Sequence, residues 1–142
     1  LGCEWLTDPV AYEGPLAGLE TGLAAIAREG ADRDWVMVVP CDHPGLAVSF
    51  LKRLIDHEEA NADAVIIESE GILNPFPGLY RAGLGEQAKS LSPEQGRGLK
   101  HLLRKVRTKI VSADLFRDID PELLNLRSVD TPGEWENFHR GE

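Results

Sequence analysis

Asp42 follows an apolar run and is held between two prolines, which makes it the first candidate for chemistry in this chain. The run Trp35–Val39 is typical of a buried strand in a parallel sheet, because such strands are hydrophobic on both faces. Ligands of open α/β sheets bind beyond the carboxyl ends of the strands. An aspartate at that edge is well placed to hold Mg²⁺ against nucleotide phosphates. Alternatively, Asp42 only caps a helix that starts near Leu46.

A glycine-rich block upstream predicts the start of a helix. Gly14 and Pro15 suit a first helical turn, since the missing N–H of proline costs nothing there, and leucines then recur at helical spacing. Gly18 inside this turn is unfavourable by about 1 kcal/mol relative to alanine. It indicates close approach of a ligand to the backbone, or simply close packing of the helix on a strand.

Near the end of the chain, Ser128–Asp130 predicts a short last strand. A helix should follow, with Thr131 as its cap, Pro132 at its first position and Glu134 completing a capping box. Asp130 is a second candidate carboxylate at a strand end. The alternative is a plain acid at the start of this helix, where negative charge is favourable.

Between these blocks, strands and helices alternate as in an α/β domain. We expect a helix over 47–59 with Phe50, Leu51, Leu54 and Ile55 inward, a buried strand over 63–67 and an antiparallel edge strand over 75–81. A helix over 83–90, a helix from Gly98 and a strand over 109–112 should follow. No repeat or linker is visible, so residues 1–142 are expected to form one domain.

Cations gather between Arg97 and Lys109, although the chain has a formal net charge of −9. Several of them are explained as the solvated side of the helix that starts near Gly98. Arg97 is also a candidate anion contact, because a guanidinium can hold phosphate with paired hydrogen bonds. The negative net charge argues against binding to nucleic acid or to an anionic membrane.

The two cysteines, Cys3 and Cys41, fit neither a metal-binding spacing nor a disulfide-rich composition. A reduced, cytoplasmic setting is therefore expected. Cys41 is expected to be a small apolar residue at a buried strand end rather than a nucleophile. No apolar run approaches the 18 residues of a membrane span, and no signal-peptide pattern is present.

Four short blocks occur in an order that resembles the molybdenum cofactor guanylyltransferases. They are Asp8, Gly14–Gly18, Pro40–Asp42 and Val129–Glu134, and the resemblance spans essentially the whole chain. It implies a Rossmann-like three-layer αβα nucleotidyltransferase fold with a mostly parallel sheet. It also implies transfer of GMP from GTP to molybdopterin, which forms molybdopterin-guanine dinucleotide and releases pyrophosphate.

The resemblance assigns roles to individual residues. Asp42 and Asp130 would be the catalytic carboxylates that hold Mg²⁺, and Asp42 would also contact the nucleotide. Asp8, Gly14 and Gly18 would lie at the ribose and base. On the molybdopterin side, Arg97 matches one arginine of a Gly-x-Arg-Arg element whose second arginine is Gly98 here. Ser128 stands where the family commonly has asparagine, so the pterin contact departs from the family pattern.

One departure concerns the phosphates of GTP. The family opens with a Gly-Gly loop and a lysine that cradle the triphosphate, and neither is found in these 142 residues. We expect the chain to be the C-terminal two-thirds or so of the domain, N-terminally incomplete. Alternatives are a cytidylyltransferase, another nucleotidyltransferase acting on a phosphorylated acceptor, or a non-catalytic homologue. Molybdoenzyme apoproteins and other proteins of the cofactor pathway are candidate partners.

Overall fold

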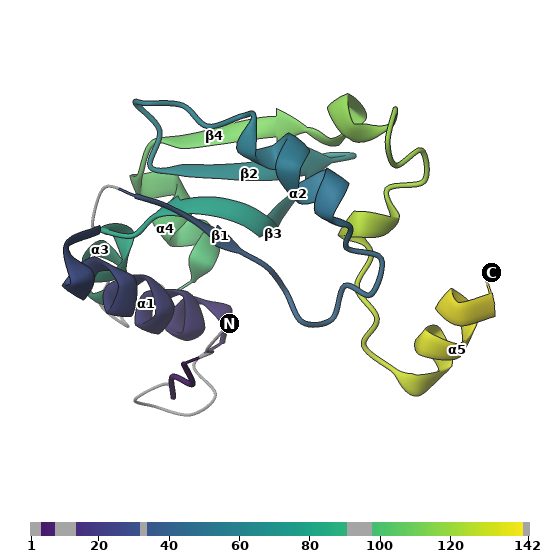
Figure 1. Ribbon diagram of the computed structural model, residues 1–142, viewed down its shortest axis with the longest axis horizontal. Helices are drawn as coiled ribbons and strands as arrows, with labels where there is room; N and C mark the ends of the chain where they lie inside the picture. The colour runs from purple at the N-terminus through teal and green to yellow at the C-terminus, as the bar shows by residue number, and fades with distance from the viewer. Residues whose placement is uncertain (1–3, 8–13, 32–33, 91–97, 141–142) are drawn as a thin grey trace.

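A four-stranded sheet forms the middle layer of the molecule (Figure 1). The computed structural model describes residues 4–7, 14–31, 34–90 and 98–140. The strands are β1 (Trp35–Val38), β2 (Ala64–Ser69), β3 (Ile72–Arg81) and β4 (Thr108–Ser112), in the spatial order β1-β3-β2-β4. The helices are α1 (Pro15–Ile26), α2 (Val48–Ile55), α3 (Leu84–Lys89), α4 (Leu99–Lys105) and α5 (Pro132–Arg140). Short turns η1 (Ala27–Ala31), η3 (Ala113–Phe116) and η4 (Leu124–Leu126) complete the described elements.

Alternating side chains of β2 show that helices cover both faces of the sheet. Ala64 and Ile66 pack with α1, α3 and α4 on one face, and Val65 and Ile67 pack with α2 and η3 on the other. All four of these β2 side chains are fully buried, as expected when the two faces of a strand are both covered. The three-layer αβα architecture is confirmed.

The expectation of a mostly parallel sheet is correct only in part. β2 and β4 pair in parallel, whereas β3 lies between β1 and β2 and is antiparallel to both. The cause is a tight hairpin between β2 and β3, in which Glu70 and Gly71 both have positive φ, 53° and 80°. Two such residues form the mirror-image turn that returns a strand beside its predecessor.

The pairing of β1 with β3 overturns two expectations about individual strands. The segment over 75–81 is not an edge strand, because β3 is hydrogen-bonded on both sides. β1 is not a fully buried strand of a parallel array either, since it is only half-buried and pairs with β3 antiparallel. Among the described strands, β1 and β4 are the edges.

Helix α1 begins where the sequence predicts. Gly14 adopts a positive φ of 80° just before Pro15, a conformation that favours glycine, and Gly14 also accepts a hydrogen bond from the Ala17 N–H. Gly18 is exposed, so tight packing on a strand does not explain it. The close helix contact occurs instead at Gly85 of α3, where a Cβ would lie 2.6 Å from the backbone N of Ala24.

Three further expectations need correction. The helix after Asp42 is shorter than expected, and Ile55 at its end is 44% exposed rather than inward. Residues 128–130 form no strand; they are extended chain that leads into α5. None of the helices in the described part of the chain is long and apolar enough to cross a membrane.

Candidate functional site

Asp42 lies in the bend that follows β1. Its side chain remains 43% exposed, and the preceding Cys41 is exposed rather than buried at the strand end. The buried position expected for Cys41 is therefore wrong, because the chain has already left the sheet there. Helix α2 starts after Ala47, whose N–H donates to the Asn125 side chain and not to Asp42, so the alternative that Asp42 caps this helix is also wrong.

A single backbone hydrogen bond brings the two candidate carboxylates to the same region. The Val129 N–H donates to the Asp42 carbonyl over 2.8 Å, which places Ser128 and Asp130 on either side of that contact. Both segments lie toward the end of the sheet where β1, β2 and β4 finish (Figure 1). Because β3 runs the other way, this end is the carboxyl edge for three of the four described strands.

A buried amide and a buried acid hold this arrangement. Asn125 accepts a hydrogen bond from the Ala47 N–H through its side-chain oxygen, over 2.6 Å. The Asn125 side chain donates in turn to the Asp120 carboxylate over 2.8 Å. Asp120 also accepts from the backbone N–H groups of Leu124 and Asn125, each over 2.9 Å. Both side chains are only 6% exposed, and buried polar groups of this kind stabilise a structure only when their hydrogen bonds are complete.

Sequence reasoning missed both Asp120 and Asn125. The Asp-Pro pair at 120–121 is a turn signal, and it would have indicated that Asp120 caps the following backbone. Nothing local indicates that Asn125 reaches the start of α2, 78 residues earlier in the chain.

His43 connects this network to Asp42. Its Nδ1 lies 3.1 Å from the Asn125 carbonyl oxygen, and its Nε2 lies 3.8 Å from a carboxylate oxygen of Asp42. The His43 side chain is 10% exposed. A proton on Nδ1 lets the ring donate a hydrogen bond to the Asn125 carbonyl, and Nε2 then faces the Asp42 carboxylate. The imidazole thus fixes the bend and is not an open ligand.

The C-terminal helix is attached to the same bend. A Cβ on Gly45 would lie 2.6 Å from the Leu124 carbonyl oxygen and 3.2 Å from the Phe138 ring, so α5 and η4 both approach the chain where only a glycine fits. Phe138 is the half-buried residue of α5, and the rest of that helix is exposed.

The capping box of α5 forms as predicted. The Glu134 carboxylate accepts from the N–H groups of Asp130 and Thr131, over 2.8 and 2.9 Å, and the Thr131 hydroxyl accepts from the Glu134 N–H over 3.2 Å. These hydrogen bonds, chiefly that from Asp130, lower the pKa of Glu134. Glu134 thus acts as the helix cap, and the Asp130 carboxylate has no partner in the described part of the chain.

The predicted site residues fall into three groups. Asp42, Ser128 and Asp130 are brought together. Gly14 and Gly18 lie on the first turn of α1, which points toward the same end of the sheet (Figure 1). Asp8 and Arg97 lie outside the described residues.

The donor set at this edge fits Mg²⁺ held partly by substrate. Within the described ranges no three His, Cys, Asp or Glu side chains cluster to form a metal cage. Asp42 and Asp130 are both accessible and have no lysine or arginine partner in the described part of the chain. Mg²⁺ is usually bound by one or two carboxylates of this kind, together with substrate phosphates and water. A closed structural metal centre does not fit this geometry, whereas a shared metal-phosphate site does.

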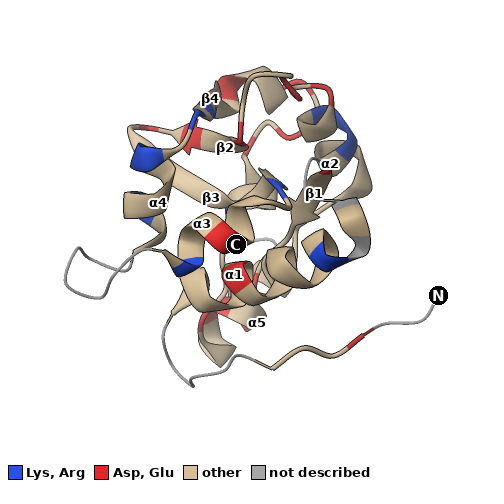
Figure 2. Cartoon of the chain, turned by 90° about the vertical axis from the view of Figure 1, so that its left-hand side faces the viewer, with Lys and Arg blue, Asp and Glu red and all other residues tan. Residues whose placement is uncertain are grey.

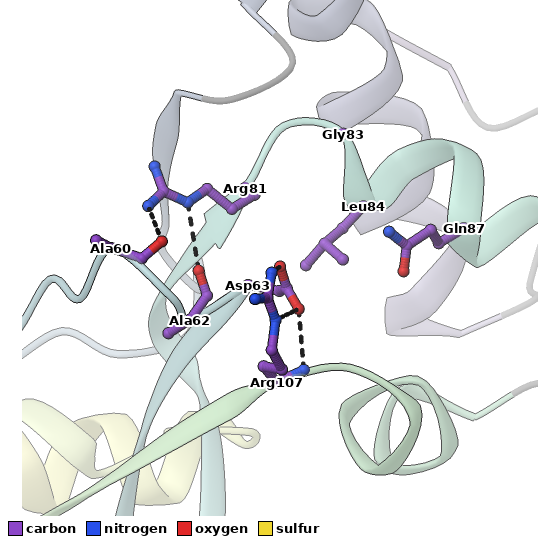
Figure 3. Close-up of a pocket in the computed structure, with 8 residues that line it drawn as sticks. All are labelled: Ala60, Ala62, Asp63, Arg81, Gly83, Leu84, Gln87 and Arg107. Atoms are coloured by element: carbon purple, nitrogen blue, oxygen red, sulfur yellow. Dashed lines mark hydrogen bonds and ion pairs between the residues drawn. The ribbon is translucent and has the colours of Figure 1, made fainter.

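The opposite end of the sheet carries a hollow of about 550 Å³ in which the charged groups Asp63, Arg81 and Arg107 are already paired (Figure 3). Asp63 accepts three hydrogen bonds from Arg107, two from the guanidinium over 2.8 and 3.0 Å and one from the backbone N–H over 3.0 Å. They lower the pKa of Asp63. The Arg81 guanidinium lies 3.9 Å from the Trp35 ring centroid and donates to the Ala62 carbonyl. The charged residues that line this hollow therefore connect the starts of β2 and β4 and the end of β3.

Residues 1–111 match the model of the family described as MobA-like NTP transferase domain. A probable molybdenum cofactor guanylyltransferase of Bacillus cytotoxicus is 30% identical over 102 residues, which cover 72% of this chain and 49% of that protein. A molybdenum cofactor guanylyltransferase of Desulfosudis oleivorans is 25% identical over 130 residues, which cover 92% of this chain and 62% of that protein.

Solved structures agree on the fold. The molybdopterin-guanine dinucleotide biosynthesis protein A of Archaeoglobus fulgidus superposes with a TM-score of 0.71 at 20% identity, over 87% of this chain and 60% of that one. A protein of Aquifex aeolicus gives a TM-score of 0.67 at 18% identity. The chain spans about half to three-fifths of the length of the curated relatives it matches.

Proposed function

Because this chain belongs to the family of MobA-like NTP transferase domains, we propose that it acts as a nucleotidyltransferase that makes molybdopterin-guanine dinucleotide. The observation that carries the proposal is the hydrogen bond from Val129 to the Asp42 carbonyl. It brings two carboxylates, Asp42 and Asp130, to the carboxyl edge of the sheet, where ligands of α/β proteins bind. The names of the curated relatives support the choice of GTP and molybdopterin as substrates.

The proposed reaction transfers GMP. A terminal phosphate oxygen of molybdopterin attacks the α-phosphorus of GTP, the bond to the bridging oxygen breaks, and pyrophosphate leaves. Such a step depends on positioning and on neutralising phosphate charge more than on covalent catalysis. Bound Mg²⁺ would supply that neutralisation, and Asp42 and Asp130 are the residues proposed to hold it.

The other predicted residues are proposed to bind the two substrates. The backbone at Gly14 and Gly18, together with Asp8, would face the nucleotide, since neither glycine carries a side chain that would keep a ligand from the backbone. Ser128, beside the Val129 contact, would face molybdopterin together with Arg97. The product would then pass to molybdoenzyme apoproteins in the cytoplasm.

Metal binding gives a test that does not need the triphosphate cradle. We would add Mn²⁺ to ¹⁵N-labelled protein and record amide spectra, because this paramagnetic ion broadens signals of nearby residues. Amides around Asp42 and around Asp130 should broaden together, and Asp42→Asn or Asp130→Asn should remove both effects. Asp118→Asn is the matched control, because Asp118 is an exposed acid that pairs with Arg53.

If Mn²⁺ still broadens the same amide signals in Asp42→Asn and in Asp130→Asn, the metal assignment is contradicted. For the reaction itself, Asp42→Ala in the full protein should abolish GMP transfer while the unfolding transition stays in place. Equal binding of GTP and CTP in the same protein would argue against guanylyl transfer and for relaxed base choice. Metal-independent binding of every nucleotide would favour a non-catalytic homologue.

A further inference from the structure

A second, unassigned hollow lies under α4, at the β4 edge of the sheet. It has a volume of about 270 Å³. Among the described residues its lining is mostly aliphatic, with two cations and no acid: Ile66, Leu73, Leu103, Val106, Thr108 and Ile110, with Lys100 and Arg104. It is separate from the Asp42–Asp130 region, none of whose residues lines it.

Incomplete cover by α4 explains why this hollow exists. Ile110 of β4 is the register partner of Ile66 of β2, so both side chains project from the same face of the sheet. Ile66 is fully buried, whereas Ile110 is 53% exposed. Helix α4 has only seven residues; it covers β2 and stops short of β4. An aliphatic corner of the sheet is thereby left without a protein partner in the described part of the chain.

The charge at the rim is the second observation. Lys100 and Arg104 are four residues apart on α4 and therefore lie on the same side of the helix, where like charges repel. Neither forms an ion pair or hydrogen bond within the described ranges, and no acid of those ranges lines the hollow to balance them. Figure 2 shows Lys and Arg on α4, on an otherwise acidic chain. An anion bound between them would relieve the repulsion.

We propose that this hollow binds a small amphipathic anion. Its apolar group would lie against Leu73, Leu103 and Ile110, and its carboxylate or phosphate would lie between Lys100 and Arg104. Ligand sites of this kind are mostly apolar with a few placed polar groups. A water molecule takes about 30 Å³, so the hollow admits a group of roughly nine non-hydrogen atoms.

Octanoate is a suitable probe, and amide spectra of the ¹⁵N-labelled chain would follow its binding. Signals from α4 and from Thr108 and Ile110 should shift in a saturable manner, and those near Asp42 should not. The double substitution Lys100→Gln, Arg104→Gln should raise the octanoate Kd by about tenfold while leaving the weaker binding of 1-octanol unchanged. Lys52→Gln, which removes an exposed cation on α2, is the matched control and should not change the octanoate Kd.

A second variant tests the apolar half. Ile110→Asn places an uncharged polar amide in the apolar part of the hollow and should weaken octanoate and 1-octanol alike. The proposal is overturned if octyltrimethylammonium shifts the same signals as strongly as octanoate, or if the double substitution leaves the octanoate Kd unchanged. Comparing octyl phosphate with octanoate then identifies which anionic head group the two cations prefer. Since no nucleotide or metal is involved, this result is independent of the proposed transferase activity.

Discussion

At the end of the sheet where β2 and β4 begin, Asp63 accepts three hydrogen bonds from Arg107. At the end where they finish, Asp42 and Asp130 pair with no lysine or arginine of the described part. At the first end, Asp63 connects the start of β2 to the start of β4 through Arg107. The second is held by backbone groups and by the buried Asp120 and Asn125, so its exposed acids remain available to a ligand. The predictions below test whether stability and binding are separated in this way.

The largest effect on stability should come from Asp120→Ala. It would leave the Asn125 amide and two backbone N–H groups buried without an acceptor, and the free energy of unfolding should fall by about 3 kcal/mol. Urea unfolding followed by circular dichroism measures it. Asp118→Ala, at an exposed acid 60% accessible to solvent, is the control and should leave the transition almost unchanged; equal losses would contradict a structural role for Asp120.

Gly45→Ala should give the next largest effect. The new Cβ would lie 2.6 Å from the Leu124 carbonyl oxygen, so η4 must move away from the bend after β1. Overpacking of this kind costs about 1–3 kcal/mol. Gly22→Ala is the matched control, since a Cβ on this α1 residue meets nothing within 4 Å. There the substitution should stabilise the helix, and thermal unfolding compares the two.

A pair of substitutions should separate the two ends directly. Asp63→Asn should lower the Tm by a few degrees and leave Mn²⁺ binding intact, whereas Asp42→Asn should weaken Mn²⁺ binding and leave the Tm intact. Differential scanning calorimetry and the Mn²⁺ titration provide the two readouts. If Asp42→Asn lowers the Tm as much as Asp63→Asn does, Asp42 is a structural acid and the comparison fails.

The pH dependence of Asp63 follows from its lowered pKa, whose ordinary value is 3.8. A carboxyl with a lowered pKa in the folded state contributes stability above its unfolded-state pKa, and that contribution is lost as the pH falls through the folded value. The Tm difference between the native chain and Asp63→Asn should therefore be constant near neutrality and should shrink below about pH 4.

The smallest effect should come from Glu134→Gln. The pKa of Glu134 is lowered by the capping hydrogen bonds, and an amide keeps one acceptor without the charge, so α5 should fray slightly at neutral pH. Because α5 is mostly exposed, amide exchange should increase within α5 while the Tm of the whole chain stays nearly constant. An equally large increase in the strands would show that α5 is coupled to the core.

Local patterns predicted the elements whose signals lie within a few residues. The start of α1, the capping box of α5 and the buried strand β2 follow from glycine, proline and apolar spacing alone. The position of β3 inside the sheet was not predicted, because its apolar pattern suits an edge or an interior strand equally well. The pairing of β1 along the other side of β3 decides between them, and no local signal indicates that pairing.

The candidate site was predicted by residue type and by resemblance, not by contact. Asp42 and Asp130 were recognised as acids beyond strand ends, although the expected strand over 128–130 is absent and a single hydrogen bond replaces it. Asn125 could not be predicted, since its effect depends on a residue far away in the sequence. Cys41 was misplaced because the strand ends at Val38, three residues before Cys41, although the apolar run continues to Val39.

The bonds that assemble the site join residues 82 and 78 positions apart, from His43 and from Ala47 to Asn125. Closing loops of this length carries an entropy cost, whereas the β2–β3 hairpin joins neighbouring residues. We therefore expect the site to assemble after the folding transition state, so that Asn125→Ala accelerates unfolding and hardly slows folding. The same separation allows residues 120–131 to open locally while the sheet persists.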